Sequence, residues 1–254
     1  MDKSRLPTII AVAFMMTAVA VGVLLVESKK VFSLKANFGT EPKQVRVSNI
    51  TDSSFTVTWV TNKESIGQLY WGENNSNLDN TEAVHISYPN YIHSITVNNL
   101  PPSSDYFFKI ASNGKFFDSS GIAWKTSTLP SIGYPQKANL ISGVIKTQNG
   151  MAVANALVFA NVGGGTLIST TTEKNGSWFL SVSMVRNQEG NDYLTLTNET
   201  AVELSVFAGP FGNATAHTNI GSAKPVPTIE LGKSYNFKNG SFVKYDVPDA
   251  SVSF

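Results

Sequence analysis

The spacing of apolar residues divides the chain into one long uncharged run followed by many short alternating runs. The long run, LPTIIAVAFMMTAVAVGVLLV at 6–26, contains 21 residues and no charged side chain. As a helix it would extend about 31 Å at about 1.5 Å per residue, and the hydrocarbon core of a membrane is about 30 Å thick. The pattern therefore predicts one N-terminal transmembrane helix.

This helix could act as a signal anchor or as a cleaved signal peptide. Residues 1–5 give either one a basic start, and Ala18-Val19-Ala20 fits an A-x-A cleavage site. Cleavage there would leave the apolar residues 21–26 at the mature terminus, so we favour an uncleaved anchor. Long downstream domains translocate largely regardless of flanking charge. We therefore expect residues 1–5 in the cytoplasm and the chain from residue 27 onward outside it, at the cell surface.

After a polar, patternless stalk at 27–41, apolar and polar residues alternate with a period of two. In FTVTWV at 55–60, Phe, Val and Trp share one face of a strand, while the two Thr and the second Val share the other. Turn signals separate the runs, and Asn113-Gly114 is typical of a type I′ hairpin. Seven short strands at this spacing predict a β-sandwich over residues 42–130.

Several short motifs in this segment point to a known family. They are SFTVTWVT around Trp59, YWG at 70–72, HSITV at 93–97, WKTSTLP at 124–130, and the pattern Leu100-x-Pro102-x-x-x-Tyr106. With these motifs, residues 42–130 resemble a fibronectin type III domain, in particular the variant that precedes the catalytic domain in purple acid phosphatases. The resemblance implies structural roles only. Trp59 would anchor the core, and Tyr106, preceded by Leu100 and Pro102, would be the corner tyrosine that locks one strand to its neighbour.

A short linker at 131–137 leads into a second set of strands at 138–237. Two stretches there carry a resemblance, ISGVIKTQNGMAVANALV at 141–158 and TEKNGSWFL at 172–180. They resemble the two halves of the carboxypeptidase regulatory-like domain, a transthyretin-like sandwich related to the B-type repeats of bacterial adhesins. The resemblance implies a structural role for Trp178. Residues 238–254 could form a final hairpin on this sandwich or a tail.

Charge and composition exclude several classes of function. The chain has 19 Lys and Arg against 18 Asp and Glu, a net charge of +1, so it lacks the basic surface that nucleic-acid binding requires. It contains no cysteine, which excludes disulfides, thiol chemistry and a lipidated-cysteine anchor. This composition fits an exported bacterial protein.

Metal-dependent phosphatase activity is the first enzymatic hypothesis, because the first domain resembles a phosphatase accessory domain. A two-metal site needs a full set of Asp, Asn and His ligands, whereas this chain has three histidines, His85, His93 and His217. His85 and His93 could face each other across a hairpin, but zinc needs three or four ligands. His93 shares its parity with the apolar residues of its strand and is expected at the core edge. We therefore expect no catalytic, cofactor-binding or metal-binding residues.

Two further sites remain open from the sequence. Tyr88 and Tyr91 could form a carbohydrate-binding surface, because sugar rings stack on flat aromatic faces. An isopeptide crosslink of the kind found in adhesin B-type domains could involve Lys146, with Glu203 and Asn236 as its possible partners.

These patterns predict an all-β protein: two tandem β-sandwiches, immunoglobulin-like and then transthyretin-like, after one transmembrane helix. The favoured function is that of a non-enzymatic, membrane-anchored extracytoplasmic surface protein with a structural, adhesive or interaction role. The alternative is a carbohydrate- or peptidoglycan-binding accessory protein, anchored or secreted. The expected partners are the membrane and a protein or glycan at the cell surface, with no nucleic acid and no cofactor.

Overall fold

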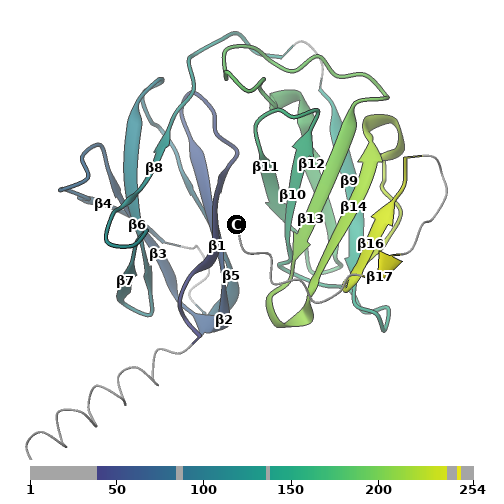
Figure 1. Cartoon of the computed structure of the whole chain (residues 1–254), viewed down its shortest axis with the longest axis horizontal. Coiled ribbons are helices and arrows are strands. Elements are labelled where there is room, and N and C mark those ends of the chain that lie inside the picture. Colours follow the sequence, from purple (N-terminus) through teal and green to yellow (C-terminus); the bar gives the residue numbers. More distant parts are fainter. Residues whose placement is uncertain (1–38, 84–87, 136–137, 239–244, 247–254) are drawn as a thin grey trace, which may run out of the picture. The chain divides into compact units, whose positions relative to one another are not determined.

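Figure 1 shows a computed structural model of the chain, which describes residues 39–83, 88–135, 138–238 and 245–246. The predicted transmembrane segment at 6–26 and its flanks at 1–5 and 27–38 lie outside the described residues. In the part of the chain that is described, no helix is long and apolar enough to span a membrane. Residues Pro42–Phe254 form one compact unit, to which all the elements below belong.

Strands β1 to β8 form the first sandwich, which consists of two antiparallel sheets (Figure 1). One sheet has the order β1-β2-β5, with bounds Lys43–Ser48, Phe55–Ser65 and Asn90–Val97. The other has the order β4-β3-β6-β7, with β8 also paired to β6, and bounds Asn80–Ala83, Gly67–Gly72, Asp105–Ser112, Lys115–Phe117 and Trp124–Ser127. The described residues therefore form one strand more than predicted. The additional strand is β4, whose sequence NTEA has no apolar alternation to reveal it.

The core of the first sandwich follows the alternation of residues 55–60. Phe55, Val57 and Trp59 of β2 have no exposed surface, and they pack with Tyr106 and other apolar residues of β6. The ring centroids of Phe55 and Tyr106 lie 5.8 Å apart. Full burial of a large apolar side chain contributes about 1.5–3 kcal/mol to the free energy of folding. This one face of β2 is therefore a main source of stability.

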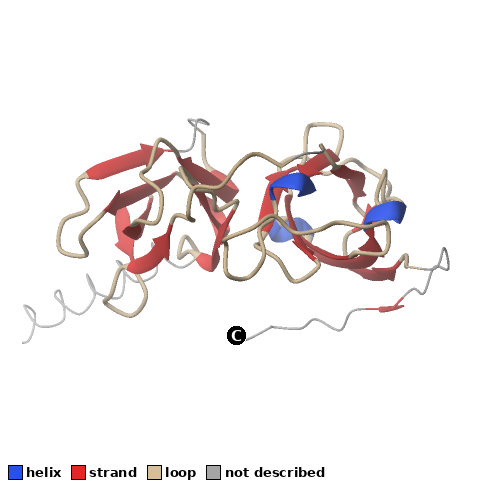
Figure 2. Ribbon diagram, turned by 90° about the horizontal axis from the view of Figure 1, so that it is seen from above, coloured by secondary structure: helices blue, strands red, loops and turns tan. Residues whose placement is uncertain are grey.

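The second sandwich has a six-stranded and a three-stranded sheet. The larger has the order β11-β10-β13-β14-β16-β17, with bounds Ile168–Thr171, Leu157–Val162, Ala201–Phe207, Asn213–Asn219, Lys233–Asn236 and Tyr245–Asp246. The smaller has the order β12-β9-β15, with bounds Ser177–Ser181, Leu140–Lys146 and Ile229–Glu230. Three single-turn helices lie in its connections and are blue in Figure 2: η1 (Val182–Met184), η2 (Gly209–Phe211) and η3 (Ile220–Ser222). The predicted all-β fold with sandwich sheets is confirmed.

Two sequence stretches singled out above meet in this second sandwich. Gly143 of β9 and Trp178 of β12 are directly opposite each other in the antiparallel pair. A Cβ atom at Gly143 would lie 2.8 Å from Cζ2 of Trp178, so only glycine leaves room for the indole ring. Trp178 is 1% exposed and packs with Ile141, Ile145 and residues of the larger sheet. The ISGVI and NGSWFL motifs therefore form one packing unit.

The other face of β2 is buried as well, because the second sandwich covers it. Thr56 and Thr58 are 2% and 0% exposed. At this contact the hydroxyls of Ser48 and Ser169 share a hydrogen bond of 2.7 Å. Asn49 exchanges two hydrogen bonds with the main chain of Ser169, at 3.0 and 2.8 Å, and its own N–H donates to the carbonyl oxygen of Leu167. Together these hydrogen bonds hold residues 48–49 of the first sandwich against residues 167–169 of the second.

Apolar and cationic groups complete the same contact. Ile92, Leu157 and Phe159 form a buried cluster with flanking residues from both sandwiches, including Phe207. The guanidinium of Arg46 lies 4.9 Å from the ring centre of Phe159 and 5.1 Å from that of Phe207. Burial lowers the pKa of this guanidinium. The contact thus combines a dry apolar cluster with a desolvated cation–π pair, and it joins the sandwiches directly rather than through the linker alone.

Candidate functional site

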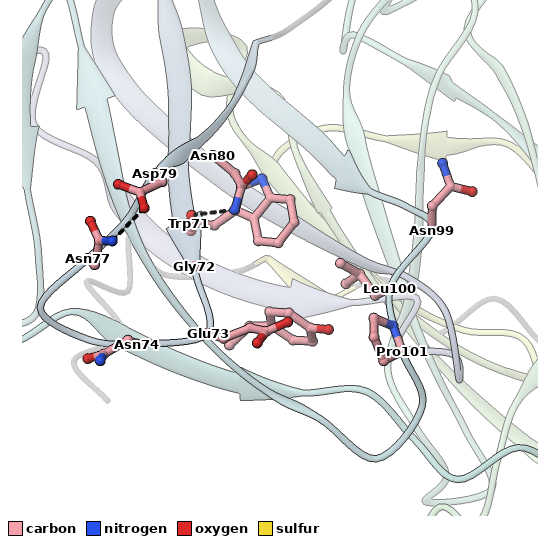
Figure 3. Close-up of a pocket in the computed structure, with 11 residues that line it drawn as sticks. Trp71, Gly72, Glu73, Asn74, Asn77, Asp79, Asn80, Asn99, Leu100 and Pro101 are labelled. Carbon is pink, nitrogen blue, oxygen red and sulfur yellow. Dashed lines mark hydrogen bonds between the residues drawn. The ribbon is translucent and has the colours of Figure 1, made fainter.

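A pocket of about 470 Å³ opens where two loops of the first sandwich meet the start of β6 (Figure 3). One wall is the turn between β3 and β4, and the other is the loop between β5 and β6. The lining residues are mostly amides, carboxylates and aromatic rings: Trp71, Gly72, Glu73, Asn74, Asn77, Asp79, Asn80, Asn99, Leu100, Pro101 and Tyr106. Its size lies within the range of about 300–1,000 Å³ that is usual for small-molecule sites.

The β3–β4 wall is shaped by glycine and by side-chain hydrogen bonds within the turn. A Cβ atom at Gly72 would lie 2.3 Å from the carbonyl oxygen of Asn77, so the turn can close only over a glycine. The Oδ1 atom of Asn74 accepts hydrogen bonds from both the N–H and the hydroxyl of Ser76, at 3.0 and 2.9 Å. The Nδ2 atom of Asn77 donates to Asp79, which Figure 3 marks with a dashed line. The side chains thus hold the wall in one conformation.

The opposite wall is tied to the body of the sandwich. The N–H of Leu100 donates to the carbonyl oxygen of Ser53 at 3.0 Å, and the Leu100 side chain is 6% exposed. The carbonyl oxygen of Pro101 accepts a hydrogen bond of 2.7 Å from the Thr128 hydroxyl. Asn99 has φ = 60°, a left-handed conformation that asparagine tolerates better than most residues. Both walls of the pocket are therefore fixed by the fold.

Two aromatic residues form the base of the pocket. The rings of Trp71 and Tyr106 meet edge to face, with centroids 5.7 Å apart. The indole Nε1 of Trp71 and the Oη of Tyr106 are both buried, and the indole has no hydrogen-bond partner among the described residues. Burial raises the pKa of the Tyr106 phenol, the charge of Glu73 acts in the same direction, and the Ser104 hydroxyl, as a hydrogen-bond partner, acts against both. A buried polar group without a partner costs about 1–3 kcal/mol, so the Trp71 indole N–H has an unmet demand for an acceptor.

The charged groups of the pocket are all acidic. Glu73 and Asp79 lie in its exposed rim, and the described lining residues include no lysine, arginine or histidine. They also include no serine, threonine or cysteine that could act as a nucleophile. Across the described residues there is no group of three or more His, Cys, Asp or Glu side chains that could hold a metal ion. The pocket can therefore bind through hydrogen bonds and ring contacts.

The residues assigned structural roles by resemblance lie mostly in the two cores. Trp59, Tyr106 and Trp178 are at most 1% exposed, Leu100 is 6% exposed, and Pro102 is exposed. Leu100 and Tyr106 also line the pocket. Tyr106 holds its neighbours through ring packing against Phe55 and Trp71.

The proposed aromatic pair lies outside this pocket. Tyr88 is 60% exposed, at the edge of the gap in the described residues at 84–87. Tyr91 is half-buried and packs against the cluster between the sandwiches. It also lies close to Gly209, where an added Cβ atom would be 2.9 Å from the Cβ of Tyr91. The structure thus leaves Tyr88 accessible and gives Tyr91 a packing role.

The histidine pair and the crosslink residues can be placed in part. His85 lies outside the described residues, whereas His93 is 1% exposed and stacks on Trp59 with ring centroids 4.8 Å apart. Lys146 is on β9 of the three-stranded sheet, and Asn236 is on β16 of the other sheet. Glu203 is an exposed residue of β13, in the larger sheet, and faces His217.

Sequence reasoning missed the pocket because its walls come from distant parts of the chain. A signal was nevertheless present in ENNSNLDN at 73–80, which concentrates amides and carboxylates between two strands. On its own such a stretch reads as a turn, because Asn, Asp and Ser dominate turns for conformational reasons.

Comparison with known proteins finds partial matches only, from about one third to about two thirds of the chain. No curated protein sequence matches the chain. Among solved structures, the sensor domain of the anti-sigma factor RsgI4 from Pseudobacteroides cellulosolvens is 20% identical, with a TM-score of 0.27, and the match covers 35% of this chain and 98% of that domain. The FN1–FN3 domains of chicken CNTN1 are 15% identical, with a TM-score of 0.26, and the match covers 69% of this chain and 64% of that one.

The central fibronectin III array of RIM-binding protein is 19% identical, with a TM-score of 0.22, and the match covers 66% of this chain and 58% of that one. Likeness at this level identifies neither a ligand nor an activity. The family model that matches is described as the N-terminal domain of purple acid phosphatase, and it matches residues 42–128. The first sandwich is therefore similar to the N-terminal domain of purple acid phosphatases, and this similarity ends before the second sandwich begins.

Proposed function

We propose that the protein is a non-enzymatic interaction module, held at the outer face of a bacterial membrane by its N-terminal helix. The uncharged run at 6–26 supports the anchor, because its length matches the hydrocarbon core. The absence of cysteine and the two β-sandwiches fit a folded part that works outside the cytoplasm.

One observation carries the interaction role, namely the preorganised polar pocket between the β3–β4 turn and the β5–β6 loop. Its walls are fixed by Gly72, by hydrogen bonds within the turn, and by the Leu100 and Pro101 anchors. A site that is already ordered loses little conformational entropy when a ligand binds. The pocket offers hydrogen-bonding groups without a nucleophile and base in contact, which supports binding rather than turnover.

The direct contact between the sandwiches supports a second part of this role, the presentation of both sandwiches as one connected unit. Hydrogen bonds from Asn49 to Ser169 and the Arg46 contact with Phe159 hold the second sandwich against the first. A joint of this kind limits motion about the linker at 131–137. The alternative function, a carbohydrate- or peptidoglycan-binding accessory protein, would use the same pocket.

Single-cysteine labelling tests the topology, because the chain has no cysteine of its own. Ser76→Cys places a thiol in the exposed β3–β4 turn, and Ser4→Cys places one before the predicted helix. On intact cells a membrane-impermeant maleimide should label Ser76→Cys and should reach Ser4→Cys only after lysis. Labelling of both or neither before lysis, or of Ser4→Cys alone, would contradict the proposal. Turnover of a chromogenic phosphate ester by the metal-loaded protein would contradict its non-enzymatic part.

A further inference from the structure

We infer that this pocket binds one ring of a neutral glycan, a pyranose with free hydroxyl groups. The inference rests on the proposed interaction function and names the class of ligand that its pocket accepts. The hydrogen-bonding groups, the charges and the aromatic rings of the lining residues support it.

The hydrogen-bonding groups of the pocket match those of a sugar. Asn74, Asn77, Asn80 and Asn99 carry amides, which like a sugar hydroxyl can both donate and accept. Within the turn, Asn74 Oδ1 already accepts from Ser76, Asn77 Nδ2 donates to Asp79, and Asn80 Nδ2 donates to the Trp71 carbonyl oxygen. The opposite atom of each of these amides and the Asn99 amide are available to a ligand. Glu73 and Asp79 accept hydrogen bonds, and a bond from a hydroxyl to a carboxylate is stronger than one between neutral groups. Figure 3 shows the labelled side chains of these residues distributed over both walls. A ring with hydroxyls around its edge can therefore be held from two sides.

The base of the pocket supplies the remaining elements of sugar recognition. Trp71 is half-buried and presents aromatic surface, against which the C–H groups of a sugar ring can pack, while the fully buried Tyr106 supports it from below. Leu100 and Pro101 add apolar surface on the second wall. The Trp71 indole N–H has no partner within the described chain, so a ligand oxygen would satisfy a donor that is otherwise unmet.

The charges of the pocket select against acidic ligands. The described lining carries two carboxylates and no basic residue, so a phosphate, a sulfate or a uronic acid would meet like charge without a counter-ion. A divalent cation is disfavoured as the main ligand because the described residues contain no cluster of three acidic or histidine side chains. These charges count against an anionic ligand and a bound metal ion, and the amides and the aromatic ring described above favour a hydroxylated one.

Binding to the full-length protein tests the inference. The protein is purified in a detergent without a sugar headgroup, and affinities are measured by calorimetry and tryptophan fluorescence. The neutral probes are cellohexaose, chitohexaose and mannohexaose, the acidic probe is hexagalacturonate, and the cation probe is calcium chloride. At least one neutral probe should bind saturably, and it should bind more tightly than the acidic probe.

Variants connect that binding to the pocket. Asp79→Asn keeps the shape and removes the charge, and Trp71→Phe keeps an aromatic ring and removes the indole N–H. Each should weaken the neutral probe about tenfold, because a hydrogen bond to a charged or buried group contributes about 1.4 kcal/mol or more. The matched control is Asn75→Ala, an exposed asparagine of the same turn that does not line the pocket, and it should leave the affinity unchanged.

The inference is overturned if no neutral probe binds, if hexagalacturonate binds more tightly than every neutral probe, or if calcium is the only ligand. Neutral binding that both Asp79→Asn and Trp71→Phe leave intact would also overturn it, because the sugar would then occupy another site. These failures are separate from a failure of the proposed function. If Ser76→Cys is labelled on intact cells but the protein binds no neutral glycan, the proposed topology stands and the inferred ligand class is wrong.

Discussion

Acidification should destabilise the first sandwich through His93, a buried histidine that the fold keeps neutral. Its Nε2 atom lies 3.1 Å from the hydroxyl of Ser65, and Trp59 covers one face of its ring. Burial lowers the pKa of His93 from 6.5 to about 4, against a small opposing effect of the Asn90 main chain. The unfolded chain therefore binds a proton at a higher pH than the folded chain does.

The sign and size of the effect follow from this difference in pKa. The contribution of neutral His93 to the free energy of unfolding is fully present above pH 6.5 and is lost as the pH falls from 6.5 toward 4. At pH 5 the unfolded histidine is about 97% protonated and the folded one about 9%, which corresponds to a loss of about 2 kcal/mol. The loss reaches about 3.4 kcal/mol below pH 4, at about 1.36 kcal/mol for each unit of pKa difference.

Urea unfolding of Pro42–Phe254 at pH 7.5 and pH 5, with and without the histidine, measures this contribution. His93→Asn and His93→Phe remove the titration, and each is compared with itself at the two pH values. Other groups with a lowered pKa are present in all three proteins, so their contribution cancels; they include Asp105, which pairs with Lys125, and Asp118, which accepts a hydrogen bond from the Gly121 main chain. The native chain should lose about 2 kcal/mol more than either variant between the two pH values. Equal losses in all three proteins would refute the assignment of a buried neutral histidine.

Three further predictions concern packing. Gly143→Ala should lower the free energy of unfolding of the second sandwich by about 1–3 kcal/mol, because the added Cβ would meet Trp178. The control is Gly133→Ala, whose added Cβ would meet nothing within 4 Å and which should leave thermal unfolding unchanged. Arg46→Ala should lower the free energy of unfolding by about 1–2 kcal/mol and increase cleavage of the linker in limited proteolysis, because it removes a partly buried cation–π contact between the sandwiches. Unchanged cleavage would count against a fixed joint. Tyr106→Phe should change the free energy of unfolding of the ligand-free protein by less than about 1 kcal/mol in chemical denaturation, because it keeps the ring that packs on Phe55 and Trp71 and removes only the buried hydroxyl beside Ser104. A larger loss would show that the hydroxyl, and not the ring, holds the corner.

The strands were predictable because a period of two directly encodes the two faces of a sheet. Residues 55–60 illustrate both the strength and the limit of this reasoning. The face of Phe55, Val57 and Trp59 was predicted as core and is core. The burial of Thr56 and Thr58 on the other face could not be predicted, because it depends on where the second sandwich packs.

The pocket was beyond sequence reasoning for a similar physical reason. The β3–β4 turn and the β5–β6 loop are separated by two strands, β4 and β5, and have no shared period, so only the folded sandwich brings Asn77 and Asn99 into one lining. Leu100 and Tyr106 were identified through a family pattern that records packing. That pattern does not reveal that the same two residues also border a cavity.

The most direct test of the central claim is the reactivity of a thiol at position 76 on intact cells. An extracytoplasmic module anchored by residues 6–26 predicts rapid labelling of Ser76→Cys by a membrane-impermeant reagent, with Ser4→Cys protected until the cells are lysed. Protection of position 76 in intact cells, together with recovery of the full-length chain in the soluble fraction, would contradict the account.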